Sequence, residues 1–264
     1  MKQWIDLGHV ALRYELAGEG PTTLVLVHEM GGTLDSWDGV LPELSRGRRV
    51  LRYDTRGAGQ SEKIHEPLTF DEMVDDLAAL LDGLGITGRV ALAGTAVGAG
   101  IALQFAVRHP GLAGAVIATS PATGLAAERR AADIARADEM ERLGMRAVAE
   151  ASFASSYPPV VRHDRAAYET FRARWLANVP ESYAAIYRML ANAEIEAGFG
   201  AIACPVLVVG GTHDLLRPPA AARAVAGLIP GARFIEVESG HFMAVQTPAA
   251  VAMVFNDFLA SVGF

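Results

Sequence analysis

Short runs of apolar, mostly β-branched residues alternate along this chain with longer segments of helical pattern. Several of these runs are apolar at almost every position, as in the strands of a parallel sheet that is buried on both faces. Such alternation is typical of an α/β fold, in which helices cover a central sheet. The expected strands are 23–28, 49–53, 89–94, 115–119, 205–210 and 232–237. An antiparallel hairpin of 2–6 and 10–16, turning near 7–9, is expected at the sheet edge.

Capping residues and prolines predict where the intervening helices begin and end. Thr69 precedes Glu72 by three positions, which is the spacing of a capping box, and it opens an expected helix over 70–84. A helix over 96–108 follows the strand 89–94 and stops before Pro110. Two further helices, 218–228 and 248–262, each carry a proline in the first turn. Strands and helices therefore alternate on both sides of a long central interruption.

Residues 121–201, called the cap segment below, break this alternation. The segment contains no convincing strand and is rich in Ala, Arg, Glu and Met. We expect a helical lid inserted into a core domain made of 1–120 and 202–264. Its ten arginines are balanced by eleven acidic residues, so the count gives no support to an arginine-rich anion trap. Most of these charges should lie on solvated helix faces, with one or two left to point into a cavity.

Composition and charge narrow the class of protein. The chain has 264 residues, 51% of them hydrophobic and 20% charged, which suits a globular protein with a sizeable core. A formal net charge of −7 argues against partners such as nucleic acids or anionic membranes, which bind clustered Lys and Arg. The single cysteine, Cys204, excludes an intrachain disulfide, and we expect it to be a buried apolar residue. Neither a signal peptide nor a membrane-spanning run is predicted, so a cytoplasmic location is expected, as a monomer or homodimer.

The segment Gly94-Thr95-Ala96-Val97-Gly98 has the spacing of a nucleophile elbow, Gly-x-nucleophile-x-Gly, between a strand and a helix. The flanking glycines allow a tight turn that lifts the central residue to the helix N-terminus. Free N–H groups there favour developing negative charge. The central residue is Ala96, whose methyl group cannot attack a substrate. Everything in this device is present except the hydroxyl group.

Two later strand ends supply the partners that such an elbow normally has. The strand 205–210 leads into a loop that carries Asp214, and the strand 232–237 is followed by His241. The order nucleophile, acid, histidine is the one expected when three strand ends bring a catalytic triad together. The acid would orient the imidazole and fix its tautomer. Asp71 and Asp75 are alternative acids, but they are expected on a solvated helix face.

The loop after the first buried strand, His28-Glu29-Met30-Gly31-Gly32, lies where an oxyanion loop is expected. One oxyanion N–H would come from Met30 and the second from Val97, directly after the elbow position. His28 borders this loop and is expected to be hydrogen-bonded within it. Glu29 stands where a glycine is usual. A carboxylate there could crowd or charge the loop, hold a water near His241, or simply face solvent.

Together these segments resemble the α/β-hydrolase superfamily over nearly the whole chain. The run Arg49-Val50-Leu51-Arg52-Tyr53-Asp54-Thr55-Arg56-Gly57-Ala58-Gly59-Gln60-Ser61 is particularly similar to the corresponding segment of 3-oxoadipate enol-lactonase-type enzymes. The resemblance implies hydrolysis of a carboxylic ester, a lactone or a carbon–carbon bond in a lidded pocket. Asp54 and Arg56 are expected to be structural residues of this segment. At position 96 alone, the chain also resembles aminoacrylate hydrolases of pyrimidine breakdown, which carry alanine there.

Three interpretations of Ala96 remain open from the sequence. In the first, the chain is an engineered Ser-to-Ala variant of a serine hydrolase. In the second, it is an enzyme in which His241 and Asp214 activate water or substrate directly. In the third, it is a ligand-binding member of the fold without activity. The second interpretation suits small activated substrates such as esters, enol lactones, enamines and β-dicarbonyl compounds. A nucleophilic Thr95 is disfavoured, because the elbow points position 96 toward substrate. No cofactor and no metal ion are expected, since His213 and His241 lack a compact ligand cluster.

Overall fold

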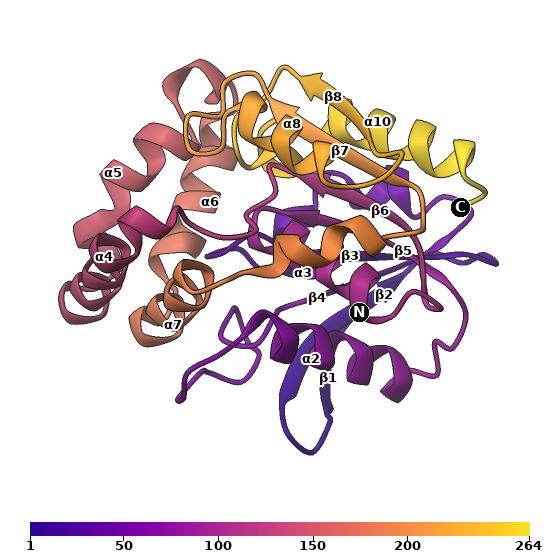
Figure 1. The fold of residues 1–264 in the computed structure, drawn as a ribbon, viewed down its shortest axis with the longest axis horizontal. Helices are drawn as coiled ribbons and strands as arrows, with labels where there is room; N and C mark the ends of the chain where they lie inside the picture. The colour runs from indigo at the N-terminus through magenta and orange to yellow at the C-terminus, as the bar shows by residue number, and fades with distance from the viewer.

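The computed structural model describes the backbone of residues 1–264 and every side chain except that of Ala127. Eight strands form one sheet in the order β1-β2-β4-β3-β5-β6-β7-β8 (Figure 1). The pairs β1–β2 and β2–β4 are antiparallel, and every other neighbouring pair is parallel. The strands are β1 (Lys2–Asp6), β2 (Ala11–Ala17), β3 (Thr23–Val27), β4 (Arg49–Tyr53), β5 (Val90–Thr95), β6 (Ala113–Thr119), β7 (Val206–Gly211) and β8 (Arg233–Val237).

The predicted mostly parallel sheet, with an antiparallel hairpin at one edge, is confirmed, and each strand ends within two residues of its expected bounds. The four helices expected outside the cap segment are also present: α2 (Phe70–Gly83), α3 (Val97–Arg108), α8 (Pro219–Gly227) and α10 (Pro248–Ser261). The Thr69 capping box forms, because the Thr69 side chain accepts from the Glu72 N–H and the Glu72 carboxylate accepts from the Thr69 N–H. The four-residue helices α1 (Leu41–Leu44) and α9 (Met243–Gln246) are too short for a sequence pattern to predict.

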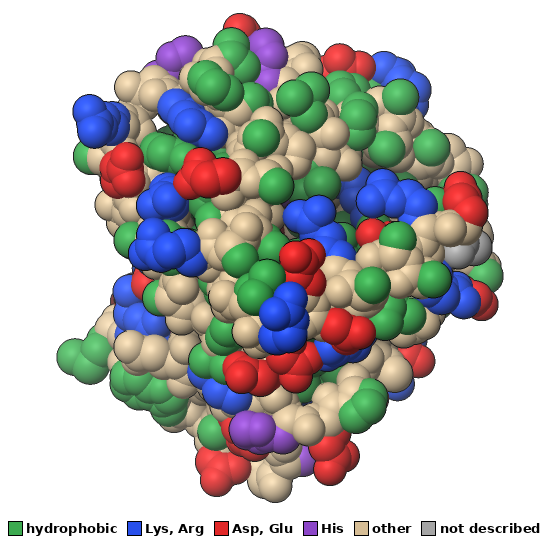
Figure 2. All heavy atoms as spheres, turned by 90° about the vertical axis from the view of Figure 1, so that its left-hand side faces the viewer, with side chains coloured by type: hydrophobic (Ala, Val, Ile, Leu, Met, Phe, Trp, Pro, Cys, Tyr) green, Lys and Arg blue, Asp and Glu red, His purple; other side chains and the backbone are tan. Residues whose placement is uncertain are grey.

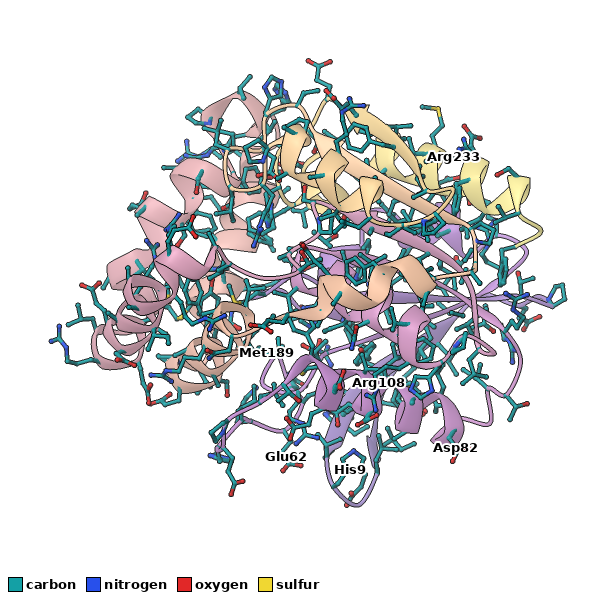
Figure 3. All side chains as sticks on the ribbon, in the orientation of Figure 1. His9, Glu62, Asp82, Arg108, Met189 and Arg233 are labelled. Atoms are coloured by element: carbon teal, nitrogen blue, oxygen red, sulfur yellow. The ribbon has the colours of Figure 1, made fainter. Side chains whose placement is uncertain are left out.

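Side chains of the central strands alternate between the two faces of the sheet, so each face has its own core. Val25 and Val27 of β3 pack with α2, α3 and α8, whereas Leu24 and Leu26 pack with α1 and α10. Arg108 ties α3 to α2 through an ion pair with Asp75 at 2.7 Å, and both helices lie along the lower half of the molecule in Figure 3. The two helical layers thereby fix the sheet, and with it the ends of the strands that carry the site.

The cap segment forms a helical layer beside one end of the sheet (Figure 1). Between β6 and β7, the described backbone contains no strand. It contains α4 (Arg130–Leu143), α5 (Met145–Ser156), α6 (Arg165–Leu176) and α7 (Pro180–Ala191), with short 3₁₀ helices at Ala127–Arg129, Pro159–Val161 and Ile195–Ala201. These helices share an aromatic core with edge-to-face ring pairs such as Phe153–Trp175, whose centroids are 5.1 Å apart. In the described chain, no helix is both long and apolar enough to cross a bilayer.

The cap helices are anchored to the loop that follows β3. The Asn178 side-chain amide donates to Gly31 O at 2.9 Å, and the Arg174 guanidinium donates to Asp35 O at 3.1 Å. The Trp175 indole packs against Gly31 so closely that a Cβ on Gly31 would lie 2.6 Å from the indole ring. The cap therefore closes directly over the loop in which an oxyanion site is expected.

Candidate active site

The turn between β5 and α3 consists of Ala96 alone. Its φ is 53° and its ψ is −114°, outside the left-handed helical region and rarely adopted by a residue with a Cβ. The Ala96 N–H donates to Thr119 O at 2.9 Å, and its carbonyl oxygen accepts from the N–H groups of Gly100 and Ala122 at 3.1 and 3.0 Å. These bonds hold a strained turn in place, and the Ala96 side chain lines the main cavity.

The two glycines that flank the turn are required by close backbone packing. A Cβ on Gly94 would lie 2.2 Å from Gly98 O, and a Cβ on Gly98 would lie 2.2 Å from Val27 O. Neither approach is possible without moving a strand or the first turn of α3. The Gly-x-Ala-x-Gly spacing therefore follows from how tightly α3 sits against β3 and β5.

Asp214 and His241 meet above the ends of β7 and β8. The Asp214 Oδ2 lies 2.7 Å from the His241 Nδ1, and both side chains are buried. Burial raises the pKa of Asp214, but the charge and hydrogen bond of His241 and the Arg217 N–H outweigh it, so the pKa falls below the ordinary 3.8. An ionised Asp214 can only accept, so the hydrogen of a neutral His241 lies on Nδ1. The Nε2 is then left as an acceptor on the side of the ring that faces the cavity.

Two residues of the same cavity wall have a backbone N–H group without a partner in the described structure. Met30 lies in the loop after β3, and Val97 is the first residue of α3; both line the cavity. Among the described residues, no acceptor takes a hydrogen bond from either N–H. A buried N–H is normally paired, and the first N–H groups of a helix favour negative charge. The arrangement is suited to holding a carbonyl oxygen that becomes an oxyanion.

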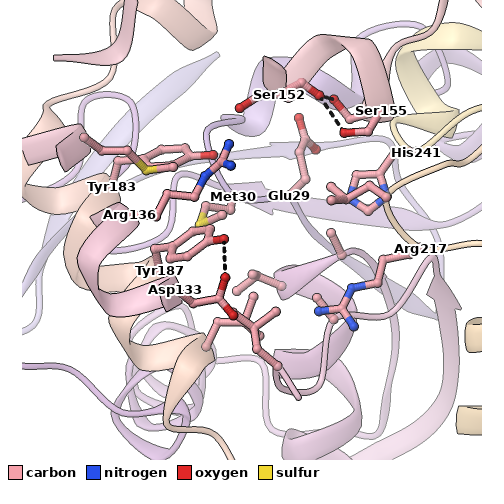
Figure 4. Close-up of a pocket in the computed structure, with 18 of the residues that line it drawn as sticks. Glu29, Met30, Asp133, Arg136, Ser152, Ser155, Tyr183, Tyr187, Arg217 and His241 are labelled. Atoms are coloured by element: carbon pink, nitrogen blue, oxygen red, sulfur yellow. Dashed lines mark hydrogen bonds between the residues drawn. The ribbon is translucent and has the colours of Figure 1, made fainter. Parts of the chain in front are cut away.

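Glu29 is buried, at 2% exposure, and this excludes the solvent-facing orientation considered from the sequence. Its Oε1 accepts a hydrogen bond from the Ser36 hydroxyl at 2.7 Å. The same oxygen packs against Gly32, where an added Cβ would lie 2.2 Å from it. The Glu29 side chain also lines the cavity, in the same region as His241 (Figure 4). Within the described part of the chain, no cationic side chain forms an ion pair with it.

His28 is occupied within its own loop. Its Nε2 lies 3.0 Å from the Thr55 N–H and therefore accepts, which leaves the hydrogen on Nδ1 to donate to Glu29 O at 2.7 Å. The ring borders a small recess behind the oxyanion loop and, among the described residues, is not part of the main cavity wall. The geometry gives His28 a positioning role for the loop.

The other candidates weighed from the sequence are held in structural contacts. Asp54 pairs with Arg13 at 3.1 Å and accepts the Leu34 N–H at 2.7 Å, while Arg56 pairs with Asp76. The Thr95 hydroxyl bonds to the Thr119 hydroxyl at 2.8 Å. The His213 side chain lies 4.0 Å from Glu238 and is absent from the described cavity wall. Cys204 is buried, and burial raises the pKa of its thiol.

The main cavity has a volume of about 380 Å³ and lies between the strand ends and the cap helices. On the sheet side it is bounded by Ala96, Val97, Met30, Glu29 and His241. On the cap side it is bounded by α4, α5 and α7, including Ser152, Ser155, Tyr183 and Tyr187 (Figure 4), and by Trp175 of α6. This volume is at the lower end of the range for small-molecule sites, so it favours a small ligand.

Three arginines line the cavity, and the sequence did not identify which ones would. Arg129 and Arg136 come from the start and the first half of the α4 region, and Arg217 follows Asp214 in the loop after β7. The sequence left one or two charges of the cap segment to point into a cavity, whereas three charged residues of this segment, Arg129, Asp133 and Arg136, line the cavity. The remaining charges of the cap mix both signs on the outer face, where Arg188 pairs with Asp138 and Glu141 (Figure 2).

Arg217 is partly buried beside the Asp214 loop. Its guanidinium donates to Gly124 O at 2.8 Å, and within the described residues it forms no ion pair with a carboxylate. Burial lowers the pKa of Arg217 below the ordinary 12.5, against the attraction of Asp214 and Glu196. A buried cation without a carboxylate partner is costly, and an anionic ligand in the cavity would offset that cost.

Comparison with known proteins gives a consistent picture. A family model described as serine aminopeptidase, S33 matches residues 19–235. A putative carbamate hydrolase RutD of Pantoea ananatis is 26% identical over 242 residues, covering 90% of this chain and 88% of the relative. A 2-hydroxymuconate semialdehyde hydrolase of a Pseudomonas species is 28% identical over 260 residues, covering 90% of this chain and 86% of that protein.

Solved structures agree with the architecture. The enol-lactonase of Burkholderia xenovorans superposes with a TM-score of 0.90 at 28% identity, covering 98% of this chain and all of that one. A thermophilic esterase of Thermogutta terrifontis gives a TM-score of 0.92 at 26% identity over the full length of both chains. The chain thus has the α/β-hydrolase fold that its sequence predicts.

Proposed function

The chain belongs to the serine aminopeptidase (S33) family of α/β-hydrolases, and on this basis we propose that it hydrolyses a small activated substrate without a covalent intermediate. The substrate class is an ester, an enol lactone, an enamine or a β-dicarbonyl compound that carries a carboxylate. His241 acts as the general base, Asp214 orients it, and Ala96 occupies the position of the usual nucleophile. The observation that carries the proposal is the buried 2.7 Å pair of His241 and Asp214 at a cavity that holds no serine at position 96.

The reaction is described for an acyl substrate. The substrate carbonyl oxygen accepts hydrogen bonds from the Met30 and Val97 N–H groups. A water molecule attacks the carbonyl carbon as His241 Nε2 takes one of its protons, and the carbonyl π electrons move to the oxygen. The intermediate then collapses, the bond to the leaving group breaks, and His241 returns the proton to that group. General base catalysis of this kind is worth about 10² to 10⁴ in rate, which suits activated bonds.

Glu29 fits this proposal as a second acceptor for the attacking water. Its Oε1 is engaged by Ser36, while Oε2 has no hydrogen-bond partner among the described residues and the side chain lines the cavity. Two acceptors, Glu29 Oε2 and His241 Nε2, would bind the two hydrogens of one water. Its lone pair would then be free to face the carbonyl carbon. Such positioning replaces the orientation that a fixed serine hydroxyl would provide.

The carboxylate of the substrate is assigned to Arg217. This guanidinium is partly buried, forms no ion pair with a carboxylate in the described structure, and borders the cavity three residues after Asp214. Arginine binds carboxylates in a bidentate, planar geometry. The small cavity volume of about 380 Å³ favours substrates of modest size over long acyl chains.

The test compares hydrolysis of short activated esters, an enol lactone and an enamine by the protein and three variants. We expect turnover by the protein, a loss of at least about 100-fold in kcat/KM for His241→Gln, and no loss for the matched control His213→Gln. The His213 side chain lies outside the cavity, so its replacement controls for a general loss of a histidine.

The third variant, Ala96→Ser, separates the alternative interpretations. A burst and fluorophosphonate labelling of Ala96→Ser, with no turnover by the unmodified protein, would identify a serine hydrolase whose nucleophile has been replaced and would overturn the proposal. A ligand that raises the melting temperature of the protein but is not consumed by any variant would instead identify a binding protein.

A further inference from the structure

Asp133 of α4 is a buried carboxylate that the proposed reaction does not use. It is 2% exposed and lines the main cavity. Its Oδ1 has two long contacts, at 3.4 Å from the Tyr187 hydroxyl and 3.4 Å from Arg129, whose side chain is 70% exposed. Its Oδ2 is buried and has no hydrogen-bond partner. A buried acceptor without a partner costs about 1–3 kcal/mol, so a ligand that donates to Oδ2 would be bound favourably.

Arg136 lies one turn further along the same helix and also has a buried polar atom without a hydrogen-bond partner. Its Nε is buried without a partner, and in the described structure its guanidinium forms no ion pair. Arg129, Asp133, Arg136 and Met140 are spaced so that they share one face of α4, and all four line the cavity. A cap helix normally turns its apolar face inward, but α4 turns a polar face toward the cavity. Figure 4 shows Asp133 and Arg136 on the cap side, across the cavity from Arg217 and His241.

Tyr187 provides a third polar group at this wall. Burial raises the pKa of the Tyr187 phenol, the nearby Asp133 carboxylate raises it further, and the nearby Arg136 guanidinium opposes this rise. The phenol therefore stays protonated. Tyr187 donates to Asp133 Oδ1 and leaves Oδ2 for another donor. The wall thus offers an acceptor from Asp133 and donors from Arg136, one helical turn apart on α4.

We propose that Asp133 and Arg136 form a recognition subsite for an amide or ureido group at the end of the substrate away from His241. An amide or ureido group presents both N–H donors and a carbonyl acceptor, which are complementary to the unpartnered Oδ2 of Asp133 and the unpartnered Nε of Arg136. The inference rests on the proposed function in one respect, since the carboxylate of the same ligand is assigned to Arg217. It adds that the protein distinguishes ω-amido acids from keto acids of the same shape.

The test measures equilibrium binding and does not depend on turnover. The probes are ω-amido acids with two to four methylene groups, beginning with succinamate, each paired with the methyl ketone of equal size, beginning with levulinate. Each pair keeps the carboxylate and the carbonyl, and only the N–H donors are lost. We expect at least one amide in the series to bind about tenfold or more tightly than its ketone, because a hydrogen bond to a charged group contributes about 1.5–3 kcal/mol.

Three variants locate the effect. Asp133→Leu should remove the preference for the amide while leaving the ketone affinity unchanged, and Arg136→Met should weaken both members of a pair equally. Asp138→Leu, on the outer face of α4, is the matched control and should change neither affinity. Equal affinity for amide and ketone in every pair would overturn the subsite but leave the carboxylate site at Arg217 intact. Failure of all the acids to bind would overturn that assignment and the subsite together, while the hydrolysis assay would still judge the reaction.

Discussion

The strained turn at Ala96 can be tested by relaxing it. Ala96 has φ 53° and ψ −114°, and glycine adopts a positive φ without a steric penalty. The change Ala96→Gly should therefore release the strain while keeping the backbone hydrogen bonds of the turn. Ala102→Gly is the matched control, because Ala102 is a buried alanine within α3, the helix that follows the turn.

The expected difference follows from what the two substitutions share. Each removes a buried methyl group, worth about 0.8 kcal/mol, and each adds backbone freedom to the unfolded chain, worth about 0.4–1 kcal/mol. These terms destabilise Ala102→Gly by about 1–2 kcal/mol. In Ala96→Gly they are opposed by the release of about 1–3 kcal/mol of backbone strain. The two variants should therefore differ by about 2 kcal/mol in free energy of unfolding, with Ala96→Gly the more stable.

Urea denaturation and thermal unfolding measure this difference directly. For a chain of this length, about 2 kcal/mol corresponds to a separation of about 4–8 °C in melting temperature. If both variants lose the same stability, within about 0.5 kcal/mol, the turn stores no strain and the reasoning is refuted. If the difference appears, the fold expends stability to hold position 96 toward the cavity.

Three further variants test the site and its elbow. The pKa of Asp214 is lowered in the folded chain, so its ionised form adds stability above about pH 4, and this stability is lost as the pH falls through the lowered pKa. The difference in free energy of unfolding between the protein and Asp214→Asn, measured by urea denaturation, should therefore narrow below about pH 4. The same variant should lose about 10³- to 10⁴-fold in kcat, since His241 would no longer hold the productive tautomer; an unchanged kcat contradicts the assigned role. Glu29→Gln should lower kcat about tenfold or more with little change in KM, because the amide oxygen takes the Ser36 hydrogen bond and the nitrogen that replaces Oε2 cannot accept from the attacking water; a change confined to KM would instead indicate substrate contact. Gly98→Ala should destabilise the fold by about 3 kcal/mol or more in chemical denaturation, because its Cβ would lie 2.2 Å from Val27 O, and near-native stability would show that the elbow yields.

The fold was predictable because its signals are local. The buried strands of the sheet are apolar at nearly every position, and the Thr69 capping box fixes the start of α2 through residues only three apart. The Gly94–Gly98 spacing was equally informative, since only glycine permits the approach of α3 to Val27 O. Asp214 and His241 could be identified because each follows a strand directly, so the sheet alone brings them together.

The polar wall of the cavity was not predictable, because its signals are not local. Arg129, Asp133 and Arg136 have the spacing of an ordinary solvated helix face, and the balanced charge of the cap segment supports that interpretation for most of its residues. What differs is the placement of α4 over the strand ends, which depends on packing between helices far apart in the chain. Glu29 shows the same limit: the sequence identifies the unusual residue, but only Ser36 and the space beside Gly32 determine that its carboxylate is buried. The residues that carry the chemistry are thus set by strand ends, whereas those that would choose the substrate are set by how the cap packs.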